Sequence, residues 1–174
     1  MKRPGVFSLF LLTLALATGG APSYHPPTEA IAFQGQLLDG GSFHLGDYLG
    51  STPVILNFWA SWGHPCGGEA ELLEKAYRQY AGRLTVVSVN VQDPEENARA
   101  FIVEHGLSYP VVIDGTAEVA WIYRVKYLPT TFFIDSSGRI VAIHRGPLKA
   151  SQLDRYIKLL LETQVSGENQ DERR

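Results

Sequence analysis

The order of apolar and polar positions predicts alternating strands and helices behind an apolar leader. Val6–Ala17 is one continuous apolar run near the start. Pro53–Phe58 and Leu84–Val91 are shorter apolar runs of the kind that form fully buried strands. Between them, Glu69–Tyr80 carries apolar residues at helical spacing. This stretch is therefore predicted to be a buried strand, an amphipathic helix and a second buried strand.

A hairpin precedes this unit, and further strands and helices follow it. The other strands are expected at Phe33–Leu37, Ser42–Leu45, Tyr109–Ile113, Thr130–Ile134 and Arg139–His144, and the other helices from Asp93 to about His105, at Ala117–Tyr123 and at Ala150–Thr163. Asp93 is the expected N-cap of its helix, because Pro94 follows it and Glu96 stands three residues after it. The alternation predicts an α/β fold in which a central sheet with parallel pairs carries helices on both faces.

The ends of the chain differ from its centre in composition. Lys2 and Arg3 precede the apolar run, whose 12 residues are too few to span a bilayer as a helix. Ala15–Ala17 then has the small-x-small pattern that signal peptidase accepts. The predicted divisions are a signal peptide at 1–17, a linker at 18–29, the globular domain at 30–165 and a polar tail at 166–174. The predicted location is extracytoplasmic, in the periplasm or cell envelope, and an uncleaved N-terminal anchor is the alternative.

The charge balance excludes one class of partner. The chain of 174 residues carries a formal net charge of −3, which becomes −5 if Lys2 and Arg3 leave with the signal peptide. The remaining sequence contains no basic cluster, so nucleic acid is not an expected partner. Contact with a membrane is expected only through an uncleaved N-terminus.

Cys66 is the one cysteine of the sequence, and its position favours reactivity. It follows a predicted buried strand and lies where a helix is predicted to begin. Free backbone N–H groups and the positive end of the helix dipole stabilise a thiolate at such a place, which lowers the pKa of a thiol. Because there is no second cysteine, Cys66 cannot close an internal disulfide. A buried, inert cysteine is the alternative.

Five separated segments of the chain follow one another in a characteristic order. They are NFWASWGHPCGGE from Asn57, VSVNVQD from Val87, YPVVID from Tyr109, LPTTFFIDSSGRIV from Leu128, and the Arg-Gly pair that ends at Gly146. In this order they resemble the thioredoxin superfamily, and within it the TlpA/ResA branch of exported thiol–disulfide oxidoreductases. The resemblance covers about residues 30–163. It implies a thioredoxin fold with an N-terminal β-hairpin extension.

The resemblance also implies roles for the residues around Cys66. The family's active-site stretch is W-x-x-W-C-x-P-C, and its first, nucleophilic cysteine is replaced here by Gly63. Cys66 matches the second cysteine, which resolves the mixed disulfide. The dithiol cycle is not expected, because it ends in a disulfide between these two positions. Glu69 matches the family's acidic residue, which can exchange a proton with the thiol, and helix capping is its alternative role. Asn57 stands where other thioredoxins have a buried acid.

Residues of the same segments are predicted to contact a substrate. Pro129 resembles the family's cis-proline, which presents backbone to an extended substrate. Trp62 offers an apolar ledge, whereas Trp59 is expected in the core. The full set of predicted substrate-binding residues is Trp62, His64, Pro65, Leu128 and Pro129.

No metal ion or other cofactor is predicted. His64 and Cys66 are close in sequence, but two ligands beside a proline-stiffened loop are too few for a metal site. The other histidines are scattered along the chain, at His25, His44, His105 and His144.

Three functional hypotheses follow, and the resemblance favours an oxidoreductase. The first is a monothiol exchanger in which Cys66 forms mixed disulfides with thiol- or disulfide-bearing envelope proteins or small thiols. The second is a non-catalytic module that binds an extended peptide beside Pro129. The third is a one-cysteine thiol peroxidase, although Gly63 lacks the hydroxyl that peroxiredoxin-like motifs place three residues before the cysteine. Rapid alkylation of Cys66 would favour the first and third hypotheses, and an inert thiol the second.

Overall fold

A computed structural model describes residues 27–62 and 66–171 of the chain, with side chains up to residue 162 except at positions 66 and 67. The predicted signal peptide, most of the predicted linker and residues 172–174 lie outside the described residues. So do Gly63, His64 and Pro65. Within the described part, no helix is long and apolar enough to cross a membrane.

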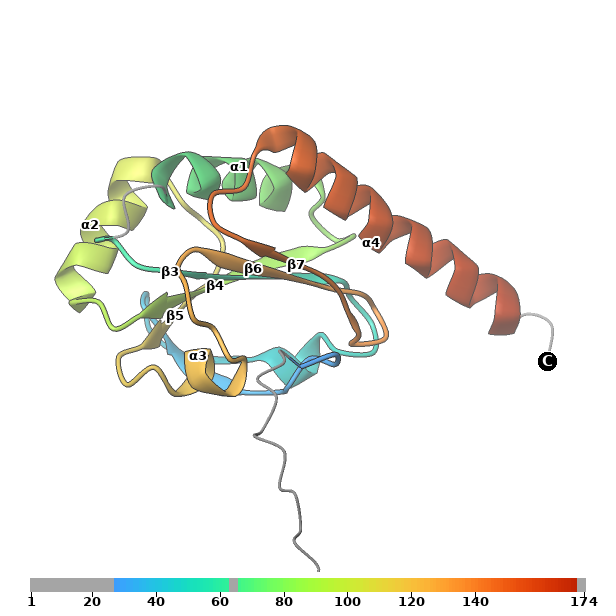
Figure 1. Cartoon of the computed structure of the whole chain (residues 1–174), viewed down its shortest axis with the longest axis horizontal. Coiled ribbons are helices and arrows are strands. Elements are labelled where there is room, and N and C mark those ends of the chain that lie inside the picture. The colour runs from blue at the N-terminus through green and yellow to red at the C-terminus, as the bar shows by residue number, and fades with distance from the viewer. Residues whose placement is uncertain (1–26, 63–65, 172–174) are drawn as a thin grey trace, which may run out of the picture.

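One mixed sheet forms the centre of the molecule (Figure 1). In the described residues its seven strands are β1 (Gln34–Leu37), β2 (Ser42–His44), β3 (Val54–Trp59), β4 (Thr85–Val91), β5 (Val111–Asp114), β6 (Thr130–Ile134) and β7 (Ile140–Arg145). They lie in the order β2-β1-β5-β4-β3-β6-β7. β4 pairs in parallel with β3 and β5, and every other neighbouring pair is antiparallel. The predicted sheet with parallel pairs is confirmed, and the N-terminal hairpin extends it beyond β5.

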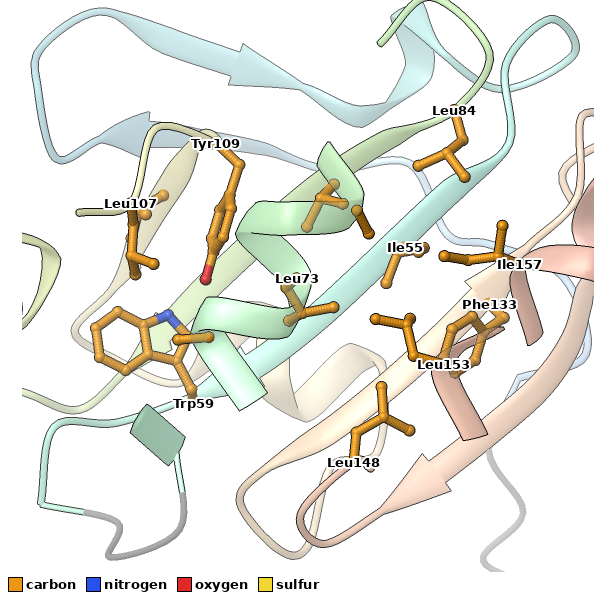
Figure 2. Close-up of a cluster of buried hydrophobic side chains, with 14 of the residues drawn as sticks. Ile55, Trp59, Leu73, Leu84, Leu107, Tyr109, Phe133, Leu148, Leu153 and Ile157 are labelled. Carbon is orange, nitrogen blue, oxygen red and sulfur yellow. The ribbon is translucent and has the colours of Figure 1, made fainter. Parts of the chain in front are cut away.

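Helices cover both faces of this sheet, as predicted. On one face lie α1 (Cys66–Gln79), α2 (Glu95–His105) and α4 (Ala150–Asp171), and on the other lie α3 (Glu118–Ile122) and the short 3-10 helix η1 (Leu45–Asp47) (Figure 1). Each face has its own apolar core. Figure 2 shows the core beneath α1, where Leu73 lies near Ile55 and Phe133 of the sheet.

The alternation of side chains along β3 places one polar residue in the core beneath α1. Ile55 and Trp59 belong to the cluster under α1, whereas Leu56 and Phe58 belong to the cluster under α3. Because successive strand residues point to opposite faces, Asn57 points toward α1 with Ile55 and Trp59.

Two helix ends differ from the predictions. Asp93 is not the N-cap of α2: the cap position is Pro94, which makes no side-chain cap hydrogen bond, and the Asp93 carboxylate binds Ser61 instead. The closing helix, predicted to end at Thr163, extends to Asp171 and takes in the start of the predicted polar tail. Gly167 is the only strong helix breaker in this added stretch, and one glycine costs only about 1 kcal/mol relative to alanine.

The N-terminal segment, residues 28–31, is attached to the start of β7 and to Tyr123. The N–H of Ile140 donates to the carbonyl of Thr28, and the N–H of Ala30 donates to that of Gly138. The buried Tyr123 hydroxyl accepts from the N–H of Ile31 at 3.0 Å and donates to its carbonyl at 2.8 Å. Residues 28 and 29, at the end of the predicted linker, are therefore part of the fold.

Candidate functional site

The predicted reactive segment joins the carboxyl end of β3 to the start of α1. β3 is buried along its whole length, so the segment leaves the sheet from a rigid central strand. Cys66 is the first residue of α1, and its backbone lies where a helix has unpaired N–H groups. The predicted position of Cys66 at a helix start is therefore confirmed. Of the other predicted residues in this segment, Trp62 and Glu69 are among those that the structure describes.

Glu69 lies in the first turn of α1, three residues after Cys66, and is buried with 3 % exposure. Its Oε1 accepts a hydrogen bond from the Asn57 side-chain amide at 3.1 Å and one from the Thr131 hydroxyl at 2.9 Å. Asn57 also donates to the Thr131 hydroxyl at 3.0 Å. These bonds join α1 to β3 and β6, so the carboxyl group is held by two strands of the sheet.

The strand register explains why these three residues meet. Asn57 and Thr131 are direct partners in the antiparallel pair of β3 and β6. Both point to the α1 face, since Phe133, two residues after Thr131, lies in the core beneath α1. The first turn of α1 then brings Glu69 over the pair. Sequence reasoning identified Glu69 but missed Thr131, and it gave Asn57 no role in holding a carboxyl group.

Burial raises the pKa of Glu69 to about 7, while the Thr131 hydroxyl and the backbone of Leu148 lower it in part. The second carboxyl oxygen, Oε2, is buried and has no hydrogen-bond partner among the residues that the structure describes. A carboxyl group with this pKa exchanges a proton readily near neutral pH, because both of its forms are populated. Glu69 is therefore able both to accept and to donate a proton near neutral pH.

The Leu128–Pro129 peptide bond is cis, as predicted. Pro129 is buried, and its carbonyl accepts a hydrogen bond from the N–H of Gly146 at 2.8 Å. It immediately precedes β6, so it lies at the same end of the sheet as the carboxyl end of β3. The predicted contact between Pro129 and the Cys66 sulfur falls on a side chain outside the described set.

A pocket of about 730 Å³ with a largely apolar lining lies on the α3 side of the cis-proline and the end of β3. It is here called the aromatic groove. Its most exposed aromatic residues are Trp62, Trp121 and Tyr127, which are 63 %, 79 % and 68 % exposed. Leu128 also lines the groove, whereas Glu69 does not. Thus the structure brings two of the predicted substrate-binding residues together here.

Sequence reasoning missed Trp121 and Tyr127. Both lie on or just after α3, where a short helix gave no clear polar face to assign. Large exposed aromatic side chains gathered in one concavity are typical of binding surfaces.

The described residues contain no group of three or more His, Cys, Asp or Glu side chains that could hold a metal ion. His105 lies 3.2 Å from Glu71, between α2 and α1, and His144 lies on β7 near Tyr156.

Comparison with known proteins identifies the family. Residues 26–143 match the AhpC/TSA family. The chain belongs to this family. It is 32 % identical over 155 residues to the thiol-disulfide oxidoreductase ResA of Halalkalibacterium halodurans, covering 88 % of this chain and 84 % of that protein. It is 35 % identical over 134 residues to the thioredoxin-like protein YneN of Bacillus subtilis, covering 75 % and 78 %.

Solved structures place the fold in the same group. This AhpC/TSA family member is similar to the thiol:disulfide interchange protein of the thioredoxin family from Chlorobium tepidum, with a TM-score of 0.69 and 27 % identity over 79 % of this chain and 97 % of that one. The predicted thioredoxin fold and the resemblance to ResA-type proteins are thus confirmed. The family is that of the thioredoxin-like thiol–disulfide oxidoreductases.

Proposed function

We propose that this protein is a monothiol exchanger that acts through Cys66 outside the cytoplasm. The observation that carries the proposal is Glu69, a buried carboxyl group with a pKa of about 7, three residues after the cysteine that begins α1. A purely structural acid at this position would gain from being exposed, because burial disfavours its charged form. Its fixed place in the first turn of α1 supports a role in proton exchange.

The exchange proceeds in two steps. The Cys66 thiol gives its proton to Glu69, and the thiolate attacks one sulfur of a partner's disulfide. A bond forms between Cys66 and that sulfur while the partner's S–S bond breaks, and the other sulfur leaves as a thiolate that Glu69 can protonate. The thiolate of an external thiol then attacks the partner's sulfur in the mixed disulfide. A bond forms between these two sulfurs while the bond to Cys66 breaks, and Cys66 leaves as a thiolate that takes up the proton that the external thiol released. The external thiol is needed because Gly63 supplies no second sulfur.

The partners are thiol- or disulfide-bearing proteins of the cell envelope, or small thiols. The basic start, the apolar run and the Ala15–Ala17 pattern support export, and the mature chain would begin near Thr18. N-terminal sequencing of the protein from an envelope fraction tests this. An intact Met1 would leave only the anchored form of the proposal.

The thiol can be tested directly. The purified protein is incubated with oxidised glutathione, and one glutathione adduct on Cys66 is expected by mass spectrometry, removable by added thiol. The rate of Cys66 alkylation near pH 7 is then compared between the wild type and Glu69→Gln. Loss of a positioned proton acceptor is expected to slow the reaction about tenfold or more.

Glu71→Gln is the matched control for this experiment. Glu71 lies on the same helix, two residues further on, with its side chain 65 % exposed, and is expected to leave the rate unchanged. A Cys66 thiol that neither forms the adduct nor reacts with the alkylating reagent would rule out the monothiol proposal.

The aromatic groove favours a second candidate, a non-catalytic module that binds an extended peptide. Its exposed Trp62, Trp121 and Tyr127 offer apolar surface independent of any thiol chemistry. The two candidates differ in one measurement. A Cys66→Ser variant that binds envelope partners as well as the wild type would support the binding module.

A further inference from the structure

The turn that follows β3 is held by a carboxylate from the end of β4. Oδ2 of Asp93 accepts a hydrogen bond from the Ser61 backbone N–H at 2.6 Å, and Oδ1 accepts one from the Ser61 hydroxyl at 2.8 Å. The side-chain amide of Asn90 donates to Oδ2 at 2.9 Å. Three donors thus converge on one carboxylate, and hydrogen bonds to a charged acceptor are about twice as strong as neutral ones.

The backbone around Asp93 is shaped to make this contact. Gln92 has a φ of 47°, in the left-handed region that residues other than glycine rarely adopt. Its N–H donates to the carbonyl of Asp114 at 3.1 Å, which ties the bend to the end of β5. Because α2 begins only at Glu95, Asp93 is free of the helix and faces Ser61. Such strain persists only where surrounding contacts determine it, and it gathers at functional sites.

Trp62 is the groove residue next to this contact. It follows Ser61 directly and lines the aromatic groove with Val91 and Gln92, from the strand end that bears Asp93. On the other side of the reactive segment, the first turn of α1 is held by Glu69. The Ser61 turn therefore has Asp93 as its one side-chain anchor among the described contacts, and Trp62 has no anchor of its own there.

We propose that Asp93 is a positioning residue of the aromatic groove. By holding Ser61 it fixes where the chain leaves β3, and so sets the orientation of Trp62 at the groove. This role does not depend on the thiol chemistry of the proposed function.

The experiment measures Trp62. Trp121→Phe serves as the background, so that Trp62 is the one exposed tryptophan, because Trp59 is only 3 % exposed. Asp93→Ala is expected to increase the acrylamide quenching constant of the exposed tryptophan and to shift its emission maximum. Asp93→Asn is expected to restore both values, because its oxygen can accept from the Ser61 N–H while its amide donates to the Ser61 hydroxyl.

Asp135→Ala is the matched control. Asp135 also accepts from the N–H and hydroxyl of one serine, Ser137, at 3.0 and 2.6 Å, but in the β6–β7 turn at the opposite end of the sheet. Because Asp135 also accepts bonds from Arg139, its loss should destabilise the fold at least as much, and it should leave the tryptophan signals unchanged. Equal signals in Asp93→Ala and in the unsubstituted background, or equal changes in Asp93→Ala and Asp135→Ala, would overturn the positioning role.

Discussion

Glu69 is an ionisable group inside a mostly apolar layer. Leu73, one turn further along α1, is completely buried on the same side. The fold accepts the carboxyl group because Asn57 and Thr131 satisfy one of its oxygens. Burial makes ionisation cost free energy, and the other oxygen has no partner among the described residues to offset this cost, so the pKa rises to about 7.

This raised pKa makes stability depend on pH with a defined sign. The folded protein holds the Glu69 proton up to about pH 7, whereas the unfolded chain releases it near the ordinary glutamate pKa of 4.5. The free energy of unfolding should therefore be highest below about pH 4.5 and fall as the pH rises through 7. The loss from this group is about 3 kcal/mol. Denaturant titrations of the wild type and Glu69→Gln between pH 5 and 8 measure the difference.

In Glu69→Gln this decline should be absent, while Glu71→Gln should keep it. A wild-type stability that rises from pH 5 to pH 8 relative to Glu69→Gln would contradict the assigned pKa.

Position 63 offers a second test at the level of one residue. If the resemblance to the W-x-x-W-C-x-P-C stretch holds, Gly63→Cys should restore a redox pair with Cys66. The variant is expected to form an internal disulfide after mild oxidation, seen as a loss of two hydrogens by mass. It should also reduce insulin faster than the wild type, which should show only background activity. If no disulfide forms, the local geometry differs from that of the family.

The partners of a buried polar residue are hard to predict from sequence. Glu69 was identified because its spacing from Cys66 is local. Asn57 and Thr131 are 12 and 62 residues away from it, and they meet it only through the register of β3 with β6. At Asp93 the local pattern is misleading. The sequence around it predicts an N-cap for the next helix, but in the structure its carboxylate binds Ser61, which is 32 residues away.

Helix α1 begins with an unusual element, two glycines in its first turn. At Gly68 a methyl group would meet nothing within 4 Å, and the backbone does not have a positive φ. Gly68→Ala is therefore expected to raise the free energy of unfolding by about 1 kcal/mol, because alanine favours helix and restricts the unfolded chain. Chemical denaturation measures this change.

Gly82 is the contrasting position, just after the same helix. A methyl group there also meets nothing, but the φ of 78° is unfavourable for alanine. Gly82→Ala should lower stability by about 1 kcal/mol. Equal effects of the two substitutions would show that the backbone conformation assigned to one of them is wrong.

The core elements were predictable and their ends were less so. β3 and β4 are buried on both faces, so their continuous apolar runs stand out in the sequence. Helix ends depend on single contacts and on weak propensities, as α2 and α4 illustrate. The exposed aromatic residues beside α3 have no sequence period to reveal them, because a helix of five residues is too short to show one.

Over the whole molecule, Tyr123 connects the N-terminal segment to the core beneath α3. Its ring packs against Phe58 and Phe132, and its hydroxyl bonds both backbone groups of Ile31. Tyr123→Phe keeps the ring but leaves these backbone groups without their partner. A loss of about 1–3 kcal/mol is expected, together with faster amide hydrogen exchange at Ile31. Unchanged exchange at Ile31 would show that the segment is held by other contacts.

The hydrogen bond between Thr28 and Ile140 fixes the start of the described chain at one end of the sheet. Pro129 lies at the opposite end of β6, whose five residues span about 16 Å. Residues 28–30 therefore join the fold at the end remote from the cis-proline. If the protein were coupled to a surface at that end, the aromatic groove and the start of α1 would face away from the surface. Both would then be accessible to proteins in solution.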